Sequence, residues 1–259
     1  MEKERKERTE IAQAAQVPAV MPVPFTPMGE IAGYRVRPGL FHINGAMALP
    51  AGVSFTVHTH EGTGCELLLF HREEEEPYAV LPFPEEYRIG DVYSMIVFGL
   101  NIEEFEYAYR IDGPWEPEKG LRFDKNAILL DPYARAVTGQ SVWGRHQEKN
   151  YHARVVKDIF DWGNTPQSKK ELSELVIYEL HVRGFTRHPS SGVSHKGTFA
   201  GLKEKIPYLK ELGINAVELM PVFEFDETMN SREADGKKLL DYWGYNTVSF
   251  FSPNTSYTA

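Results

Sequence analysis

The segment from Leu175 to Pro221 constrains the fold most, because its pattern is that of a strand, a helix and a second strand. Residues 175–182 are rich in alternating β-formers, which predicts a strand. Thr198 can cap a helix that stops at Gly213 and whose apolar residues recur at helical spacing: Leu202, Ile206, Leu209 and Leu212. Residues 215–220 predict the second strand. Two strands joined in this way must run parallel, and we expect both to be buried on both faces, as at the start of a parallel barrel.

Composition narrows the class of function. A net charge of −9 argues against nucleic acid and acidic membranes as partners, since both require clustered Lys and Arg. No apolar run approaches the roughly 18 residues of a membrane span. The single thiol, Cys65, excludes an internal disulfide framework. Residues 1–10 are charged in both signs and lack the apolar stretch of a signal peptide, so we expect a cytoplasmic protein, with the oligomeric state left open.

Four regions follow one another along the chain. Residues 1–33 form a charged tail and a Pro-rich linker, and residues 34–138 carry short alternating segments separated by Gly, Pro and Asp-Gly turns. This spacing is typical of an immunoglobulin-like β-sandwich, with strands predicted at 53–57, 65–70, 92–97 and 105–111. An irregular connector, 139–174, leads to 175–259, the first part of an incomplete (β/α)8 TIM barrel.

Two histidines raise the question of a metal site. His58 and His60 lie two residues apart in a predicted strand end, so their rings can point the same way, and the pattern is similar to the start of a cupin metal motif. The next acid, Glu66, falls late for that motif. The alternative is a strand end and a turn with exposed imidazoles. We favour this second interpretation and predict no metal and no other cofactor.

Four carboxylates of the barrel segment are candidates for chemistry or substrate contact. Glu179 and Glu218 lie within the two predicted strands, and such a pair suggests acid/base chemistry on a sugar or ester. Catalytic groups in barrels project from the carboxyl ends of strands, so we favour a hydrogen-bonded network inside the barrel for this pair. Asp226 and Glu227 follow the second strand and are better placed for contacts at the active face.

Aromatic residues concentrate just after these acids, in Tyr242-Trp243-Gly244-Tyr245-Asn246. Aromatic faces stack on the apolar faces of pyranose rings, and an adjacent Asn can bond sugar hydroxyls. Taken alone, three aromatics so close together also fit a core. The sequence has no Gly-rich phosphate loop, no Ser-centred nucleophile elbow and no zinc spacing.

Several motifs in order carry a family resemblance. Residues 105–115 (FEYAYRIDGPW), 120–123 (GLRF) and 129–134 (LLDPYA) resemble the amino-terminal module of isoamylase-type glycogen debranching enzymes, a β-sandwich related to carbohydrate-binding module 48. Residues 178–185 (YELHVRGF), 197–202 (GTFAGL), 216–222 (AVELMPV) and 242–246 (YWGYN) resemble the first barrel segments of the same enzymes, which belong to glycoside hydrolase family 13.

The resemblance implies a retaining hydrolysis of α-1,6 branch points in glycogen, limit dextrin or a related α-glucan. In the family an Asp nucleophile, a Glu acid/base and a second Asp lie on the fourth, fifth and seventh barrel strands. We expect this chain to be an amino-terminal fragment without those positions, so it carries no catalytic residue and is inactive alone. The aromatic residue under the scissile sugar maps to Tyr245, with Tyr242 as the alternative, and Trp243 and Asn246 complete the predicted substrate-binding group.

A second hypothesis is a glycan-binding or regulatory module without hydrolase activity. It requires exposed aromatic residues that hold glucan, and Trp115 and Trp143 are the candidates. The sandwich departs from the family pattern at Val36–Leu40 and at His58–Glu61, which leaves glycan binding by the sandwich itself open.

Overall fold

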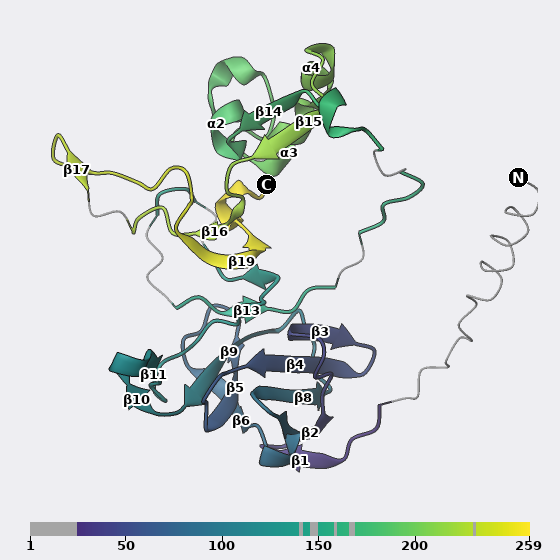
Figure 1. Ribbon diagram of the computed structural model, residues 1–259, viewed down its shortest axis with the longest axis vertical. Coiled ribbons are helices and arrows are strands. Elements are labelled where there is room, and N and C mark those ends of the chain that lie inside the picture. Colours follow the sequence, from purple (N-terminus) through teal and green to yellow (C-terminus); the bar gives the residue numbers. More distant parts are fainter. Residues whose placement is uncertain (1–24, 140–141, 146–149, 158–159, 166–168, 230–231) are drawn as a thin grey trace, which may run out of the picture.

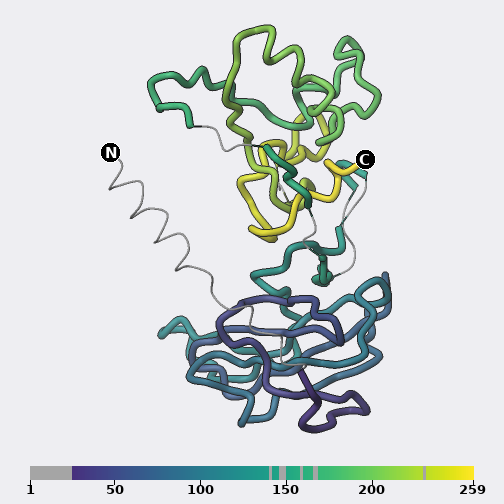
Figure 2. Tube along the Cα trace, turned by 90° about the vertical axis from the view of Figure 1, so that its right-hand side faces the viewer, coloured from purple at the N-terminus to yellow at the C-terminus, as the bar shows by residue number. Residues whose placement is uncertain are grey.

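The computed structural model describes residues 25–139, 142–145, 150–157, 160–165, 169–229 and 232–259. The predicted charged tail and most of the Pro-rich linker, residues 1–24, lie outside these ranges. The described residues form two lobes, with the sandwich below and the segments after residue 175 above (Figure 1). A view turned by 90° shows the same separation (Figure 2). The helices in the described ranges all fall short of the length and apolarity that crossing a membrane requires.

The lower lobe consists of two antiparallel sheets. The first has the order β1-β2-β8-β4-β3, with β7 paired to β8. Its strands are β1 (Gly29–Ile31), β2 (Tyr34–Pro38), β3 (Gly45–Leu49), β4 (Gly52–His58), β7 (Arg88–Ile89) and β8 (Val92–Phe98). The second sheet has the order β12-β13-β9-β5-β6. Its strands are β5 (Gly64–His71), β6 (Pro77–Pro82), β9 (Phe105–Asp112), β12 (Ala136–Val137) and β13 (Ala153–Arg154). The predicted β-sandwich is confirmed.

Alternation along the strands builds the core between the two sheets. Val53, Phe55 and Val57 share one face of β4 and are buried, as the sequence predicts. Phe55 meets Tyr107 of the facing sheet edge-to-face, with ring centroids 5.1 Å apart. Burying each such side chain stabilises the fold by about 1.5–3 kcal/mol. The sandwich therefore has a hydrophobic core of its own.

The outer faces of both sheets are also covered. On β4 the small hydroxyl residue Thr56 bonds Ser94 of β8 at 2.6 Å, and residues 39–43 cross above them, where Ser54 accepts from the amide of Leu40. On the second sheet Leu68 and Phe70 are fully buried, and the His152 ring stacks on Phe70 at 3.8 Å. These covers explain why the strands are more continuously buried than a one-sided alternation predicts.

Pairing in the two sheets begins before residue 34 and continues after residue 138. Strand β1 pairs with β2 through Ile31↔Tyr34, and β13 pairs with β9 through Ala153↔Tyr107. Both strands are too short for periodicity to reveal, because two or three residues do not establish an alternation. The domain limits 1–33, 34–138, 139–174 and 175–259 stay predictions.

The upper lobe contains the strand–helix–strand unit. Its elements are β14 (Ile177–Leu180), α2 (Val182–Arg187), α3 (Phe199–Glu204), α4 (Ile206–Glu211) and β15 (Ala216–Leu219). Strands β14 and β15 pair in parallel from Ile177↔Ala216 to Leu180↔Leu219, which confirms the predicted direction. The Thr198 hydroxyl caps α3 by accepting from the amide of Gly201, and Gly213 follows α4 with φ +86°.

Two sequence expectations for this unit are wrong. The first strand ends at Leu180, and Val182 begins helix α2, because the His181 ring accepts the Gly184 amide and so caps a helix there. The single helix expected after Thr198 is divided at Lys205. Pro207 at the start of α4 lacks an amide hydrogen and cannot continue the hydrogen-bond ladder of α3.

The expectation that both strands are buried on both faces is also wrong. Ile177, Val217 and Leu219 are between 41% and 53% exposed. Two strands form a narrow sheet, and the described residues place no further strand beside either of them. Apolar side chains that a wider parallel sheet covers are therefore open to solvent.

An antiparallel pair joins the upper lobe to the sandwich. It consists of β16 (Phe223–Phe225) and β19 (Thr247–Pro253). Ser252 of β19 donates to the carbonyl of Ala134 at 2.7 Å, and Tyr133 stacks on Phe251 with centroids 5.5 Å apart. The remaining strands form two small hairpins: β10 (Trp115–Glu116) with β11 (Leu121–Arg122), and β17 (Glu233–Ala234) with β18 (Lys237–Lys238).

Candidate functional site

The candidate site lies at the carboxyl end of β14, where His181 connects the strand to α2. The His181 ring stacks on Tyr242 with centroids 4.3 Å apart and an interplanar angle of 14°. Its Nε2 lies 2.7 Å from the carbonyl oxygen of Tyr242 and 3.2 Å from the Tyr257 hydroxyl. Residues 61 and 76 positions further along the chain are thus fixed to the end of this strand.

The hydrogen bonds of His181 determine its protonation state. Nδ1 accepts the Gly184 amide at 3.0 Å, so the proton of the neutral ring lies on Nε2, which donates to the Tyr242 carbonyl. Burial lowers the pKa of His181, and the nearby Arg183 adds to the effect. Protonation at Nδ1 also removes the cap of α2. His181 therefore acts here as a neutral scaffold residue that positions Tyr242.

An aromatic cluster supports this arrangement from below. Trp143, from the connector, stacks parallel to Tyr257 with centroids 5.9 Å apart, and Phe225 meets its edge. The Arg183 guanidinium lies 4.5 Å from the centroid of the Trp143 ring. Val182 and Phe225 pack with Tyr257 in one buried cluster. The floor of the site is thus closely packed and mostly apolar.

The predicted substrate-binding group forms an exposed rim on this floor. Tyr245 is 69% exposed, Trp243 61% and Tyr242 44%, and the rings of Trp243 and Tyr245 meet edge-to-face at 6.4 Å. Asn246 is exposed, and its nearest polar contact is a long one to the Met229 sulfur at 4.0 Å. Open aromatic faces beside an amide suit the faces and hydroxyls of a sugar.

Gly244 allows this rim to form. Its φ is +81°, and a Cβ there would lie 2.6 Å from the Phe225 ring. Its amide donates to the Asp241 carboxylate at 3.2 Å. A larger residue would have to change both the backbone angle and the buried Phe225. The turn therefore keeps Trp243 and Tyr245 on the outside of the cluster.

The acids after the second strand do not reach the surface, and the expectation for Asp226 and Glu227 is wrong. Both are buried, with 4% and 0% exposure. Asp226 accepts the amide and hydroxyl of Thr228, and Glu227 accepts the Ser256 hydroxyl at 2.9 Å. Their position after the second predicted strand indicated contacts at the active face, but residues 254–257 return over them and bury them. These carboxylates hold the loop around the site.

Glu224 is a third buried acid beside them. It accepts the Thr255 amide at 2.6 Å, and burial raises its pKa to about 7. Glu179 and Glu218, by contrast, are register partners on β14 and β15, and both side chains are exposed. Neither a buried network nor a desolvated acid/base pair forms from Glu179 and Glu218 among the described residues.

His58 and His60 lie at the exposed end of β4. His60 pairs with Asp91 at 3.1 Å, and Glu66 lies on β5 with Arg110 as its partner at 3.9 Å. Within the described ranges no three residues of the metal-binding types come together. The two tryptophans of the second hypothesis differ: Trp115 is 65% exposed, whereas Trp143 belongs to the aromatic floor.

Sequence reasoning missed His181 and Arg183 as parts of the site, and it named Trp143 only as a candidate glucan-holding aromatic of the sandwich. A histidine directly after an apolar strand, followed three residues later by Gly184, is a signal for a helix cap, and it was available. Trp143 gave no such signal, because it comes from an irregular segment and its contacts are all long-range.

Comparison with known proteins finds similarity to carbohydrate-active enzymes over both lobes. Residues 42–134 match the family "Carbohydrate-binding module 48 (Isoamylase N-terminal domain)". Isoamylase 3, chloroplastic, from Oryza sativa subsp. japonica is 37% identical over 246 residues, which cover 85% of this chain and 31% of that protein. A glycogen debranching enzyme from Serratia proteamaculans (strain 568) is 32% identical over 241 residues, which cover 87% of this chain and 35% of that protein.

The chain is similar to isoamylase-type debranching enzymes over most of its own length. Pullulanase type I from Bacillus subtilis str. 168, solved in complex with maltose, superposes with a TM-score of 0.61 and 26% identity, covering 83% of this chain and 28% of that one. The chain spans about a third of the length of the curated isoamylase-type relatives it matches. The family resemblance deduced from the motifs is confirmed.

Proposed function

We propose that this chain is the amino-terminal part of a debranching glycoside hydrolase that cleaves α-1,6 branch points of glycogen or a related α-glucan. The observation that carries the proposal is that isoamylase and debranching-enzyme relatives align with both lobes, over 85% and 87% of the chain. A retaining hydrolase needs two carboxyl groups about 5–5.5 Å apart at the scissile bond. The acids at this site are buried supports, so we propose that the chain alone does not hydrolyse glucan.

We further propose that residues 175–259 are the first part of a (β/α)8 barrel. The parallel pair β14–β15, with α3 and α4 between the strands in sequence, is the repeating unit of such a barrel. The exposed apolar residues Ile177, Val217 and Leu219 support the idea that further strands and helices cover this sheet. A cytoplasmic location stays a prediction.

In this proposal Tyr245 carries a sugar ring, with Tyr242, Trp243 and Asn246 around it. The test is the affinity of the purified chain for maltotetraose, measured by calorimetry or NMR titration. Tyr245→Ala should abolish the part of the binding that involves the upper lobe. Tyr208→Ala is the matched control, because Tyr208 is a half-exposed tyrosine on α4 away from the rim.

The same samples test whether the chain alone hydrolyses glucan. Incubated with branched glucan, the chain should release no reducing ends above a heat-treated blank. Hydrolysis at a rate that scales with protein concentration would refute the proposed inactivity. Unchanged binding in Tyr245→Ala, with the Tyr208→Ala control folded, would refute the role of the rim.

A glycan-binding module without hydrolase activity is the second candidate, and the exposure of Trp115 favours it. Its ring stands on β10, with 65% of the residue open to solvent. Co-sedimentation with glycogen that is lost in Trp115→Ala and retained in Tyr245→Ala would support this function over the first. The reverse pattern would place the binding in the upper lobe.

A further inference from the structure

A cavity of about 670 Å³ opens at one end of the sandwich, away from the aromatic rim. Its walls come from three places in the sequence: the end of β4 with His58, the β10–β11 hairpin with Leu121, and the segment 123–132. Small-molecule sites typically measure about 300–1,000 Å³. The cavity is thus large enough to accept the end of a short oligosaccharide.

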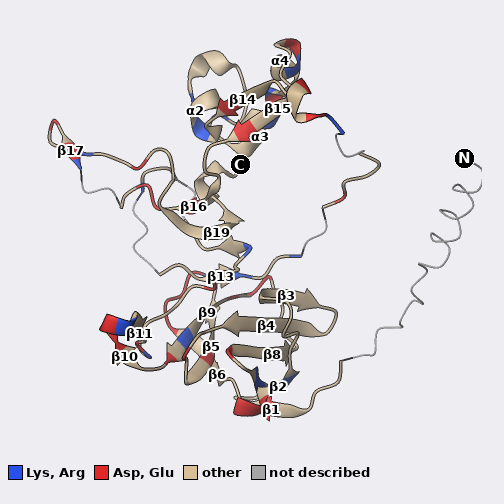
Figure 3. Ribbon diagram, in the orientation of Figure 1, with Lys and Arg blue, Asp and Glu red and all other residues tan. Residues whose placement is uncertain are grey.

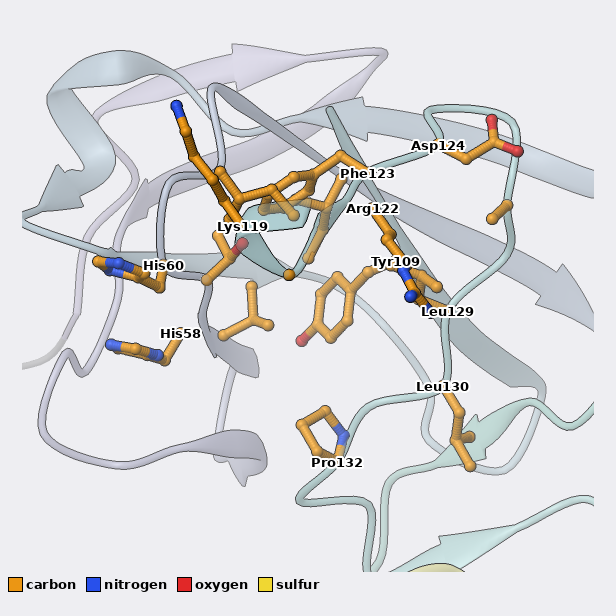
Figure 4. A pocket seen from close by; sticks show the side chains of 16 residues that line it. His58, His60, Tyr109, Lys119, Arg122, Phe123, Asp124, Leu129, Leu130 and Pro132 are labelled. Atoms are coloured by element: carbon orange, nitrogen blue, oxygen red, sulfur yellow. The ribbon is translucent and has the colours of Figure 1, made fainter. Parts of the chain in front are cut away.

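The floor of the cavity holds an unpartnered polar group. Tyr109 is 1% exposed, and its hydroxyl is buried without a hydrogen-bond partner among the described residues. Figure 4 shows this hydroxyl pointing into the space between His58 and Pro132. A buried hydroxyl without a partner is unfavourable, so a native structure rarely keeps one without a reason. A ligand that hydrogen-bonds to the Tyr109 hydroxyl therefore removes the free-energy cost of leaving that hydroxyl unpaired.

The walls around this hydroxyl are mostly apolar. Phe123 and Leu129 face the cavity and are partly open to solvent. The Phe123 ring lies so close to the backbone of Gly113 that a Cβ there would come within 2.6 Å of it. The Asp112-Gly113 turn therefore sets the position of an aromatic wall. Such a wall suits the apolar face of a pyranose.

The charges at the mouth favour a neutral ligand. Lys119 forms an ion pair with Glu116, and His60 pairs with Asp91 at 3.1 Å. Figure 3 shows acidic and basic residues close together on the β10–β11 hairpin. A third basic residue of the lining, Arg122, is matched in number by the acidic Asp124. The lining therefore has no marked excess of positive charge that would select an anion. A neutral, polyhydroxylated molecule fits a cavity whose lining combines hydrogen-bond donors, hydrogen-bond acceptors and apolar faces.

We propose that this cavity binds a terminal glucose unit of an α-glucan, with Phe123 against a sugar face and the Tyr109 hydroxyl bonded to a sugar oxygen. The choice of an α-glucan rests on the proposed function, whereas the location rests on the cavity itself. The side chains around the Tyr109 oxygen shift apart when the sugar enters, because that oxygen is closed to water in the free chain. The site is distinct from the Trp115 ring and from the Tyr245 rim.

The test is a titration of the whole chain with maltotriose, followed by NMR, in variants of the cavity. Ala127 lines the cavity, so Ala127→Trp fills its mouth and should weaken this binding at least tenfold. Tyr109→Phe keeps the shape and removes one hydrogen bond, which should weaken it about two- to tenfold. Lys125→Trp is the control, since Lys125 is exposed and does not line the cavity.

The outcomes separate the cavity from the proposed function. If no maltooligosaccharide binds anywhere on the chain, both proposals fail. If maltotriose binds equally to the parent chain, Ala127→Trp and Tyr109→Phe, and is lost in Trp115→Ala or Tyr245→Ala, the cavity proposal fails and the glucan proposal stands. Weaker binding in both cavity variants, with the larger effect in Ala127→Trp and binding unchanged in Lys125→Trp, supports the cavity.

Discussion

Removing the hydroxyl of Tyr107 tests the buried pair that it forms with Asp131. Both residues are fully buried, and the Tyr107 hydroxyl donates to Asp131 Oδ2 at 2.7 Å. The amide of Tyr133 donates to Oδ1 at 2.8 Å. Tyr107→Phe keeps the ring in the core and leaves Asp131 with the amide of Tyr133. The substitution thus removes the hydrogen bond to this buried carboxyl group, together with the contact between the hydroxyl and the backbone of Ala46.

The size of the effect depends on the charge of Asp131. A hydrogen bond contributes about 0.5–1.5 kcal/mol with neutral partners and about 1.5–3 kcal/mol with an ionised one. Burial raises the pKa of Asp131 above its ordinary value of 3.8, so the stability that this group contributes is complete below that pH and is lost as pH rises through its folded pKa. The bond from Tyr107 limits this rise. Tyr107→Phe should therefore destabilise the sandwich by about 1 kcal/mol in acid and by up to about 3 kcal/mol at higher pH.

Tyr109→Phe is a matched control on the same strand. Tyr109 is equally buried, but its hydroxyl has no partner among the described residues. Its removal should leave the sandwich unchanged or stabilise it by up to about 1 kcal/mol. Hydrogen exchange of β5 and β9 amides, measured from below pH 3.8 to pH 8, reports the lower lobe separately from the upper one. Equal losses in the two variants, or a Tyr107→Phe deficit independent of pH, would refute the reasoning.

Three further predictions concern other parts of the chain. Gly52→Ala places a Cβ 2.2 Å from the backbone oxygen of Val97 and should destabilise the sandwich by about 1–3 kcal/mol. The measurement is the midpoint of urea unfolding, which should fall. A midpoint within error of the parent would contradict the close packing of β4 on β8. His181 should titrate below 6.5 in an NMR pH series, and the stability it contributes is present above that pH and lost as pH falls; an ordinary pKa would contradict its neutral role. Burial raises the pKa of Glu224 to about 7, so the stability that Glu224 contributes is complete below pH 4.5 and is lost as pH rises through 7. Glu224→Gln should therefore reduce the pH dependence of the unfolding free energy between pH 5 and pH 8. An unchanged pH dependence would show that other groups cause it.

The long strands could be predicted from sequence, and the short ones could not. The predicted segments 53–57, 65–70, 92–97 and 105–111 match β4, β5, β8 and β9 to within a residue at each end. Each strand is long enough to show a hydrophobic pattern, and each pairs with a strand on both of its sides. Strands β12 and β13 have two residues each, and they exist because Ala153 meets β9. Long-range pairing of this kind leaves no local pattern.

The same distinction holds at the candidate site. The aromatic group Tyr242–Asn246 was predicted from its composition, and the structure places its rings on an exposed rim. The burial of Asp226 and Glu227 was not foreseeable, because residues 254–257, nearly thirty positions later, cover them. Local chemistry identified which residues suit a sugar, whereas tertiary contacts decided which of them are accessible.

The contact between Ala134 and Ser252 has a consequence for the order of events during translation. The carbonyl of Ala134 ends the Asp131–Ala134 turn of the sandwich, and its hydrogen-bond donor lies 118 residues further along the chain. While the ribosome is adding those residues, the two sheets can close around Phe55 and Tyr107. The Ala134 carbonyl meanwhile stays hydrated at the growing protein's surface. The Ala134 carbonyl can accept the Ser252 hydroxyl only after β19 has been synthesised. The folded sandwich therefore provides the surface against which the later lobe packs.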